Sequence, residues 1–144
     1  MKKGFTMIEL IFVIVILGIL AAVAIPKLAA TRDDANIAKE TTEIATAIQD
    51  IGSYYTANGL FGDVSVMTNV QFSGDGNLST VPNYQVNGVD CIDFNASLAA
   101  LGEGNFTVTN VTGVTNALCN QVQDLVDTRD LNKSYSFGGK KVVW

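Results

Sequence analysis

Residues 1–26 read MKKGFTMIELIFVIVILGILAAVAIP and differ in character from the rest of the chain. Two lysines come first, and residues 10–25 contain no charged or strongly polar side chain. The 21 residues of the segment 5–25 would form a helix of roughly 30 Å, which matches the hydrocarbon core of a bilayer. The segment can therefore span a membrane. The lysines predict a cytoplasmic N-terminus and place everything after Pro26 outside the cytoplasm.

Glu9 is an ionisable side chain inside this otherwise apolar segment. A carboxylate at the middle of a membrane helix costs about 2.5 to 3.5 kcal/mol on insertion scales. The cost is smaller near a helix end, but such a carboxylate still needs a partner. We therefore treat Glu9 as a candidate functional residue.

The run GFTMIE at residues 4–9, with its short basic leader and the apolar helix that follows, resembles the prepilin peptidase site of type IV pilins and type II secretion pseudopilins. The resemblance implies cleavage between Gly4 and Phe5, N-methylation of Phe5, and pairing of Glu9 with the Phe5 amine of a neighbouring subunit. Two charges that are each costly in a membrane would then neutralise each other only when the next subunit docks in register.

Two other readings of the segment stay open. A Sec signal peptide would use the small residues Ala22-Val23-Ala24 as its cleavage site, but Glu9 inside the apolar region argues against it. A simple transmembrane anchor would explain the hydropathy but neither Glu9 nor the junction of Gly4 and Phe5. No cysteine near the segment offers a site for lipoprotein attachment.

The resemblance implies a structural subunit that is not an enzyme. Its partners would be copies of itself in a filament, the bacterial inner membrane, prepilin peptidase, an assembly ATPase and a platform protein. The head would lie in the periplasm before assembly, and the filament in the periplasm or on the cell surface. A type IV pilus and a type II secretion pseudopilus share this N-terminus; a monomeric membrane-anchored or secreted binding domain is the alternative of another class.

The chain divides into a leader, 1–4, a membrane-spanning or filament-core helix, 5–25, an amphipathic helix half, 26–58, and a globular head, 59–144. We expect the apolar helix to be weakest at Gly18 and Pro26. Glycine adds conformational freedom, and proline cannot donate a backbone hydrogen bond. We expect a mild kink, and the resemblance implies a loss of helical regularity in assembled filaments.

The amphipathic half shows one apolar stripe at helical spacing, with charged residues on its other faces. The stripe consists of Ile37, Ile44, Ile48, Ile51 and Tyr55. It should cover the head domain, and Asn58-Gly59 is a helix stop signal.

The head alternates short apolar runs with Gly, Asn, Ser and Thr, which predicts an α+β fold with an antiparallel sheet packed on the long helix. Asn87-Gly88 is the favoured two-residue hairpin turn. The expected elements are a loop or edge strand at 64–72, a hairpin of 84–86 with 89–92, a short helix at 94–101, a strand at 106–111, a helix at 115–127, and a hairpin of 134–137 with 140–144 around Gly138-Gly139.

Composition excludes several functions. The chain has no histidine, which removes His-based zinc sites and the commonest general base. Its net charge of −5 would become −7 after loss of the leader lysines, so we expect no nucleic-acid binding through bulk charge. The pair Lys140 and Lys141 could still form a small cationic patch.

Cys91 and Cys119 would meet an oxidising compartment if the head lies outside the cytoplasm. We predict a disulfide between them that closes a loop of 29 residues and contributes about 3.5 kcal/mol on the chain-entropy model. The alternative is two buried free thiols. A redox site is disfavoured because the pair lacks CxxC spacing.

Two patterns in the head bear on ligands and modification. The run Asp75-Gly76-Asn77-Leu78-Ser79 resembles the start of a calcium loop, but Val86 stands where the bidentate acid should be, so a Gly-rich turn without a metal or cofactor is expected. Five Asn-x-Ser/Thr sequons occur, and in all but that of Asn110 an acid lies two residues earlier. The four candidate glycosylation sites are Asn77, Asn95, Asn105 and Asn132.

Overall fold

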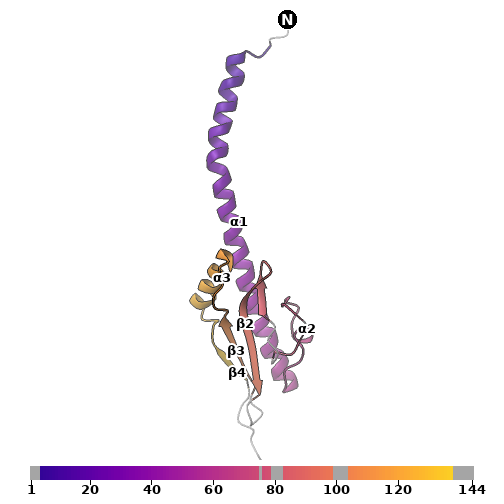
Figure 1. The fold of residues 1–144 in the computed structure, drawn as a ribbon. Coiled ribbons are helices and arrows are strands. Elements are labelled where there is room, and N and C mark those ends of the chain that lie inside the picture. Colours follow the sequence, from indigo (N-terminus) through magenta and orange to yellow (C-terminus); the bar gives the residue numbers. More distant parts are fainter. Residues whose placement is uncertain (1–3, 75, 79–82, 99–103, 138–144) are drawn as a thin grey trace, which may run out of the picture. The chain divides into compact units, whose positions relative to one another are not determined.

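The structure is a computed structural model that describes residues 4–74, 76–78, 83–98 and 104–137. The chain forms two compact units, Met1–Asn36 and Ile37–Trp144. The fold is α+β, as predicted. Its elements are α1 (Met7–Asn58), α2 (Val64–Met67), β1 (Asn83–Val86), β2 (Val89–Leu98), β3 (Gly104–Asn110), α3 (Ala117–Thr128) and β4 (Ser134–Phe137) (Figure 1).

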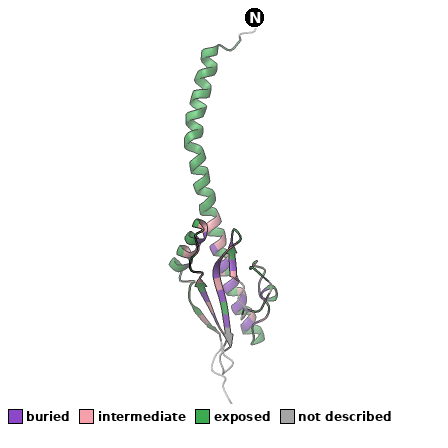
Figure 2. Cartoon of the chain, viewed as in Figure 1, coloured by how far each residue is buried: buried purple, intermediate pink, exposed green. Residues whose placement is uncertain are grey.

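The N-terminal unit consists of the first part of α1 and the residues before it. Every described residue from 4 to 35 is exposed (Figure 2). The α-helix continues through Gly18 and Pro26, so these residues do not interrupt it in the single chain. Whether they loosen the helix in a filament stays a prediction.

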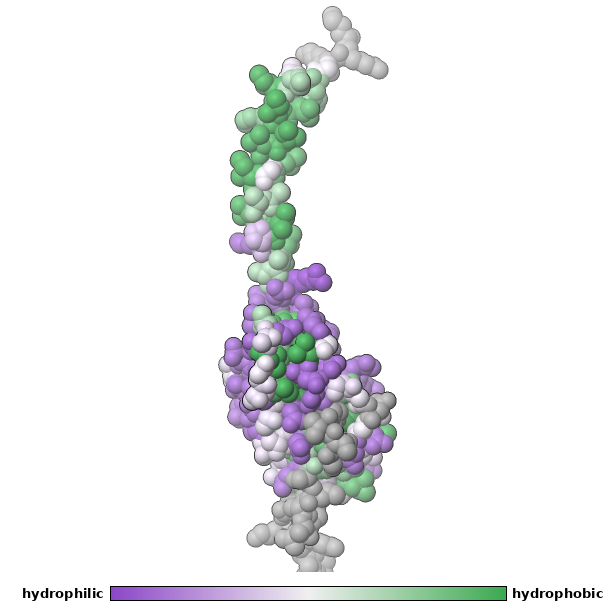
Figure 3. Space-filling view, in the orientation of Figure 1, coloured by the Kyte–Doolittle hydropathy of each residue, from purple (hydrophilic) through white to green (hydrophobic). Residues whose placement is uncertain are grey.

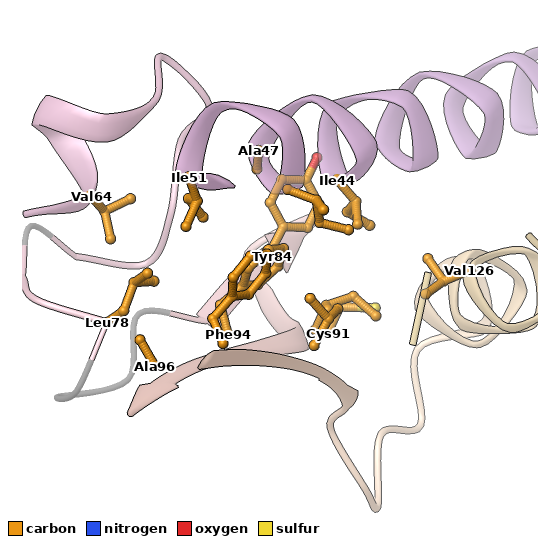
Figure 4. Packing of buried hydrophobic residues seen from close by; sticks show 14 of the residues in the cluster. Ile44, Ala47, Ile51, Val64, Leu78, Tyr84, Cys91, Phe94, Ala96 and Val126 are labelled. Carbon is orange, nitrogen blue, oxygen red and sulfur yellow. The ribbon is translucent and has the colours of Figure 1, made fainter. Parts of the chain in front are cut away.

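The second unit, called the head from here on, includes residues 37–58 of α1 as well as the globular part predicted from residue 59; this part of α1 packs on one face of the sheet. Figure 4 shows Ile44, Ala47 and Ile51 directed from α1 toward residues of the sheet such as Phe94. The predicted stripe is confirmed: four members are buried and the other is partly buried, namely Ile44, Ile48, Ile51, Tyr55 and Ile37. The helix ends at Asn58, and Gly59 takes a positive φ of 71° while its N–H donates to the Tyr55 carbonyl.

The four strands form one antiparallel sheet in the order β1-β2-β3-β4. The predicted hairpin is confirmed, because Asn87 (φ 52°) and Gly88 (φ 75°) form the turn between β1 and β2. Positive φ at both central residues is the requirement of a type I′ turn.

Strand pairing separates an apolar from a polar face. Directly paired residues share a face, and the pairs Phe94 with Val108 and Ala96 with Phe106 lie on the face that packs against α1. Residues of the opposite face are small and polar, such as Asn95 paired with Thr107. This alternation places the core between α1 and the sheet.

One sequence prediction for the head was wrong, and a second was right only in part. The expected helix at 94–101 is instead the second half of β2, which pairs with β3 as far as Leu98; residues 99–101 lie outside the described part. Phe94 and Ala96 are buried and Asn95 between them is exposed, so the period of two prevailed over helical propensity.

The segment 64–72 is not an edge strand. It begins with the short helix α2, whose Val64 and Met67 lie three residues apart and are both buried, and it continues as a loop. The final hairpin is described only in its first arm, because β4 matches 134–137 and residues 138–144 lie outside the described residues.

The helix predicted at 115–127 is α3, Ala117–Thr128, and its start is set by Asn116. The Asn116 side-chain oxygen accepts hydrogen bonds from the backbone N–H groups of Leu118 and Cys119 at 3.0 and 3.1 Å. The fully buried residues of α3 are Cys119, Val122 and Val126, whereas Leu118 and Leu125 are only partly buried.

A disulfide joins Cys91 on β2 to Cys119 on α3, as predicted. Both cysteines are buried in the hydrophobic core. Beside them, the Gln123 side chain donates to the carbonyls of Cys91 and Val111 at 2.8 and 2.9 Å. The bridge and these hydrogen bonds hold α3 at one end of the sheet.

Candidate functional site

The start of α1 is closed by reciprocal hydrogen bonds between Thr6 and Glu9. The Glu9 Oε2 atom accepts from the Thr6 backbone N–H at 2.9 Å and from the Thr6 hydroxyl at 2.6 Å. In return, the Glu9 backbone N–H donates to Thr6 Oγ1 at 3.3 Å. This is a capping box, in which the N-cap residue and the residue at N3 satisfy each other's backbone donors.

The capping box gives Glu9 a partner that sequence reasoning missed. The signal was present, because Thr6-Met7-Ile8-Glu9 has the Ser/Thr-x-x-Glu pattern of a capping box before an apolar run. Both hydrogen bonds to the carboxylate use Oε2, and Oε1 accepts none from the described residues. One oxygen of Glu9 therefore holds the helix end while the other stays open to a further donor.

The surface around Glu9 is apolar. A shallow hollow of about 760 Å³ is lined by Glu9 together with apolar residues, namely Phe5, Ile8, Ile11, Phe12, Val13 and Val15. Along the N-terminal part of α1 the visible surface is almost entirely hydrophobic, whereas hydrophilic residues cover much of the head (Figure 3). In length and composition α1 is a helix that could cross a membrane.

The predicted processing residues, Gly4 and Phe5, lie at the start of this apolar surface. Gly4 and Phe5 precede the helix, both are exposed, and 81% of Phe5 is accessible. A Cβ on Gly4 would meet nothing within 4 Å. The junction between Gly4 and Phe5 is therefore accessible, as a peptidase site must be.

A second polar cluster ties α1 to β1, and no sequence pattern predicted it. The Tyr84 hydroxyl lies within hydrogen-bonding distance of Glu40 and 2.8 Å from Glu43 Oε2; Figure 4 shows this hydroxyl directed toward α1. Lys39 Nζ lies 3.0 Å from Glu43 and 3.4 Å from Glu40. Because a phenol has one proton, Tyr84 donates to one carboxylate at a time, and Lys39 offsets part of their charge.

The pKa shifts in this cluster follow from its geometry. Burial raises the pKa of Tyr84 far above its ordinary value, and both carboxylates add to the rise. Burial also acts to raise the pKa of Glu43, but hydrogen bonds from Tyr84 and Lys39 outweigh it and lower the net pKa. Tyr84 therefore acts as a neutral donor and Glu43 as an ionised acceptor near neutral pH.

The four candidate glycosylation sites differ in their surroundings. Asn95 and Asn105 lie within the paired strands β2 and β3, and Asn77 forms an isolated bridge with Asp63. Asn132 lies in the exposed loop between α3 and β4, where its side-chain amide donates to Asp127 at 2.8 Å.

The described part of the chain includes acidic side chains and the two cysteines. Among them no group of three or more Cys, Asp and Glu side chains could hold a metal ion. The calcium-like run begins at Asp75, which lies outside the described residues, so that prediction remains untested.

Comparison with known proteins supports the reading of the N-terminal segment. Residues 1–25 match a family model described as the prokaryotic N-terminal methylation motif. The match covers the N-terminal segment alone and indicates a prepilin-like N-terminus, of the kind that type IV pilins and pseudopilins carry; proteins of that class are typically structural subunits. No curated protein and no solved structure was found to match the chain.

Proposed function

We propose that this chain is a structural subunit of a type IV pilus or pilus-like filament. Prepilin peptidase would remove residues 1–4 by cleaving between Gly4 and Phe5, and Phe5 would then be N-methylated. The mature chain would polymerise through the apolar part of α1. The observation that carries the proposal is the N-terminal part of α1, residues 7–28, which is fully exposed, largely apolar and contains a single carboxylate, Glu9; one oxygen of this carboxylate accepts no hydrogen bond from the described residues.

The geometry at Glu9 fits an assembly contact between subunits. Cleavage would create a charged amine on Phe5, four residues before Glu9, and this amine needs a counter-charge in an apolar setting. Oε1 of Glu9 could accept from the Phe5 amine of a neighbouring subunit while Oε2 keeps the helix cap. Removing one charge would leave the other buried between helices without a counter-charge, which strongly destabilises the contact.

The exposed helix also needs a cover. Apolar side chains along residues 5–28 can be shielded from water only by lipid or by other helices. The inner membrane would shield these side chains before assembly, while the head lies in the periplasm. Neighbouring subunits would shield them in the filament. Extraction from the membrane would require an assembly ATPase and a platform protein.

We favour a pilus over a type II secretion pseudopilus for this subunit. The reasons are the disulfide in the head and the departure of residues 75–86 from a calcium-loop pattern. Gene neighbours would discriminate, because a secretin with twitching genes indicates a pilus and a secretion operon indicates a pseudopilus.

The test is mass spectrometry of the native N-terminus together with microscopy of sheared surface material. We expect a chain that begins with methylated Phe5, and filaments in the parent that are lost in Glu9→Ala. Retention of residues 1–4, a start at any residue other than Phe5, or undiminished filaments in Glu9→Ala would contradict the proposal. Absence of filaments in the parent would instead favour a monomeric anchored domain.

A further inference from the structure

Four charged side chains lie between residues 27 and 34 of α1, directly after its apolar run. They are Lys27, Arg32, Asp33 and Asp34, and all four are exposed. None of them forms an ion pair with the described residues. Lys27 lies at the end of the apolar run, where a lysine can reach water at a membrane surface. The other three lie just beyond it, close to any layer of helices that packs through the run.

The spacing of these charges prevents pairing within the helix. Side chains meet along a helix at separations of three and four residues. No residue three or four positions from Arg32, Asp33 or Asp34 carries a charge. The next part of α1 differs, because Lys39 lies four residues before Glu43 and its Nζ is 3.0 Å from that carboxylate. The helix itself therefore supplies no partner for the charges at 32–34.

Asp34 lies on the same side of α1 as Glu9, and Arg32 lies on nearly the opposite side. The helix is continuous over these residues. At about 100° for each residue, Glu9 and Asp34 lie within about 20° of one another around the axis, and Arg32 lies about 160° from Asp34. One side of α1 thus presents two acids, and the opposite side presents a cation.

The contact proposed for Glu9 sets how far a neighbouring chain is shifted. Phe5 precedes Glu9 by four residues and lies before the first residue of α1. To bring its amine beside Glu9 of another chain, a parallel neighbour must move toward the C-terminal end of α1 by about 6 to 9 Å, which equals about four to six residues of helix. Arg32 of the neighbour then lies level with about residues 36–38 of the first chain.

At that level, Arg32 of the neighbour can reach Asp34. The two residues differ in height by roughly 3 to 6 Å, and side chains of a helix lean toward its N-terminus, which brings the guanidinium down toward the carboxylate. A neighbour on the Glu9 side that keeps the same rotation also turns its Arg32 toward Asp34. Ala30 and Ala38, one turn on either side of Asp34, leave room for a long side chain.

From this placement we propose that Asp34 binds Arg32 of the neighbouring chain, as a second charge pair beside that of Glu9 with Phe5. The inference rests on the proposed function, since it needs a filament. Both acids belong to one chain and both cations to the next, so the contact is head-to-tail and can extend without closing. Lys27 fits less well, because it lies on the same side of α1 as Asp34 and so on the far side of the neighbour.

Charge reversal tests the pair. Asp34→Arg and Arg32→Asp each set like charges against each other, and each should reduce the filaments in sheared material by at least about tenfold. The double variant Arg32→Asp with Asp34→Arg exchanges the two ends of the pair and should restore filaments. In every variant the subunit is measured in membranes and its N-terminus is checked for a start at Phe5, so that lost insertion or processing is not taken for lost assembly.

Asp33 provides the matched control, because it has the same charge and is also exposed but points about 100° away from Asp34. Asp33→Arg should keep filaments at the parent level and should not rescue Arg32→Asp. Parent-level filaments in Asp34→Arg, no rescue in the double variant, or rescue of Asp34→Arg by Lys27→Asp instead of Arg32→Asp would overturn the pair while the dependence on Glu9 stands. A parent without filaments would overturn the proposed function, and this pair with it.

Discussion

The ring of Tyr55 occupies the space that a side chain on Gly104 would need. A Cβ built on Gly104 would lie 2.3 Å from Tyr55 Cε2 and Cζ. The ring cannot move aside easily, because it packs on Phe61 with centroids 4.6 Å apart and on Phe137 at 6.2 Å. This contact sets how closely β3 approaches α1.

Gly104→Ala should therefore destabilise the head. Overpacking of this kind costs about 1 to 3 kcal/mol, and the free energy of unfolding from a denaturant titration would measure it. Gly74→Ala is the control, since a Cβ there meets nothing within 4 Å and no positive φ is involved. Equal midpoints for Gly104→Ala and the parent would show that Tyr55 yields at little cost.

Removing the disulfide should also lower the stability of the head. Cys91 and Cys119 close a loop whose ends are 28 residues apart, so Cys91→Ala with Cys119→Ala should lose about 3.5 kcal/mol by the chain-entropy estimate. Addition of a reductant should lower the unfolding midpoint of the parent and leave that of the double variant unchanged. A reductant effect on both proteins would mean that the loss does not come from this bridge.

Tyr84→Phe should weaken the attachment of α1 to β1. The variant leaves Glu40 and Glu43 without their phenol donor, and a hydrogen bond to a charged group contributes about 1.5 to 3 kcal/mol. We expect a loss near the lower end, because the Glu43 side chain is 38% exposed. Tyr54→Phe is the control, since the Tyr54 hydroxyl makes no hydrogen bond with the described residues and Tyr54 is also partly buried.

The effect of Tyr84→Phe should depend on pH. The pKa of Glu43 in the folded protein lies below its ordinary value of 4.5, so the ionised carboxylate is the form that the fold stabilises. This contribution is complete above the unfolded pKa and is lost as the pH falls through the folded pKa. The stability difference between parent and variant should thus be constant near neutral pH and shrink below about pH 4.5. A difference that grows on acidification would contradict this assignment.

The parts of the fold that sequence predicted well are those set by local patterns. A helix over residues 5–25 could be predicted because a long apolar run has few structural solutions. The turn at Asn87-Gly88 could be predicted because a positive φ restricts the residue type. The stripe from Ile44 to Tyr55 followed from helical periodicity.

The features that the sequence did not predict depend on contacts between distant segments. Phe94 follows a pattern that both a strand and a short helix allow, and only pairing with β3 decides for the strand. The contact of Tyr84 with Glu40 joins residues 44 positions apart, and nothing local indicates it. The capping box of Thr6 and Glu9 is different, because its Thr-x-x-Glu pattern before an apolar run indicates it locally.

A glycan on the mature chain is expected at Asn132. The reason is that its exposed loop leaves room for a bulky group, whereas Asn95 and Asn105 lie in paired strands. Intact mass would reveal any added mass, and Asn132→Gln should then remove it while Asn95→Gln should not. A mass equal to that of the methylated mature chain would reject glycosylation altogether.

Substitutions at Glu9 can separate its two roles, because the cap needs only a side-chain oxygen and the assembly contact needs a charge. Glu9→Gln keeps an oxygen that can accept from the Thr6 N–H, since glutamine also serves at N3 of a capping box. Glu9→Ala removes both the cap and the charge. If the charge drives assembly, both variants should lose filaments, and microscopy of sheared material with the subunit measured in membranes would show it.

The converse change acts on the cap alone. Thr6→Ala removes the hydroxyl that contacts Glu9 but leaves the carboxylate, at a cost of about 0.5 to 2 kcal/mol to the helix end. We expect Thr6→Ala to reduce filament yield only modestly and Thr6→Ser to restore it. Filaments in Glu9→Gln at the parent level, with loss in Thr6→Ala, would reverse the assignment: Glu9 would then serve to hold the start of the helix, and the neighbouring amine would have to find another counter-charge.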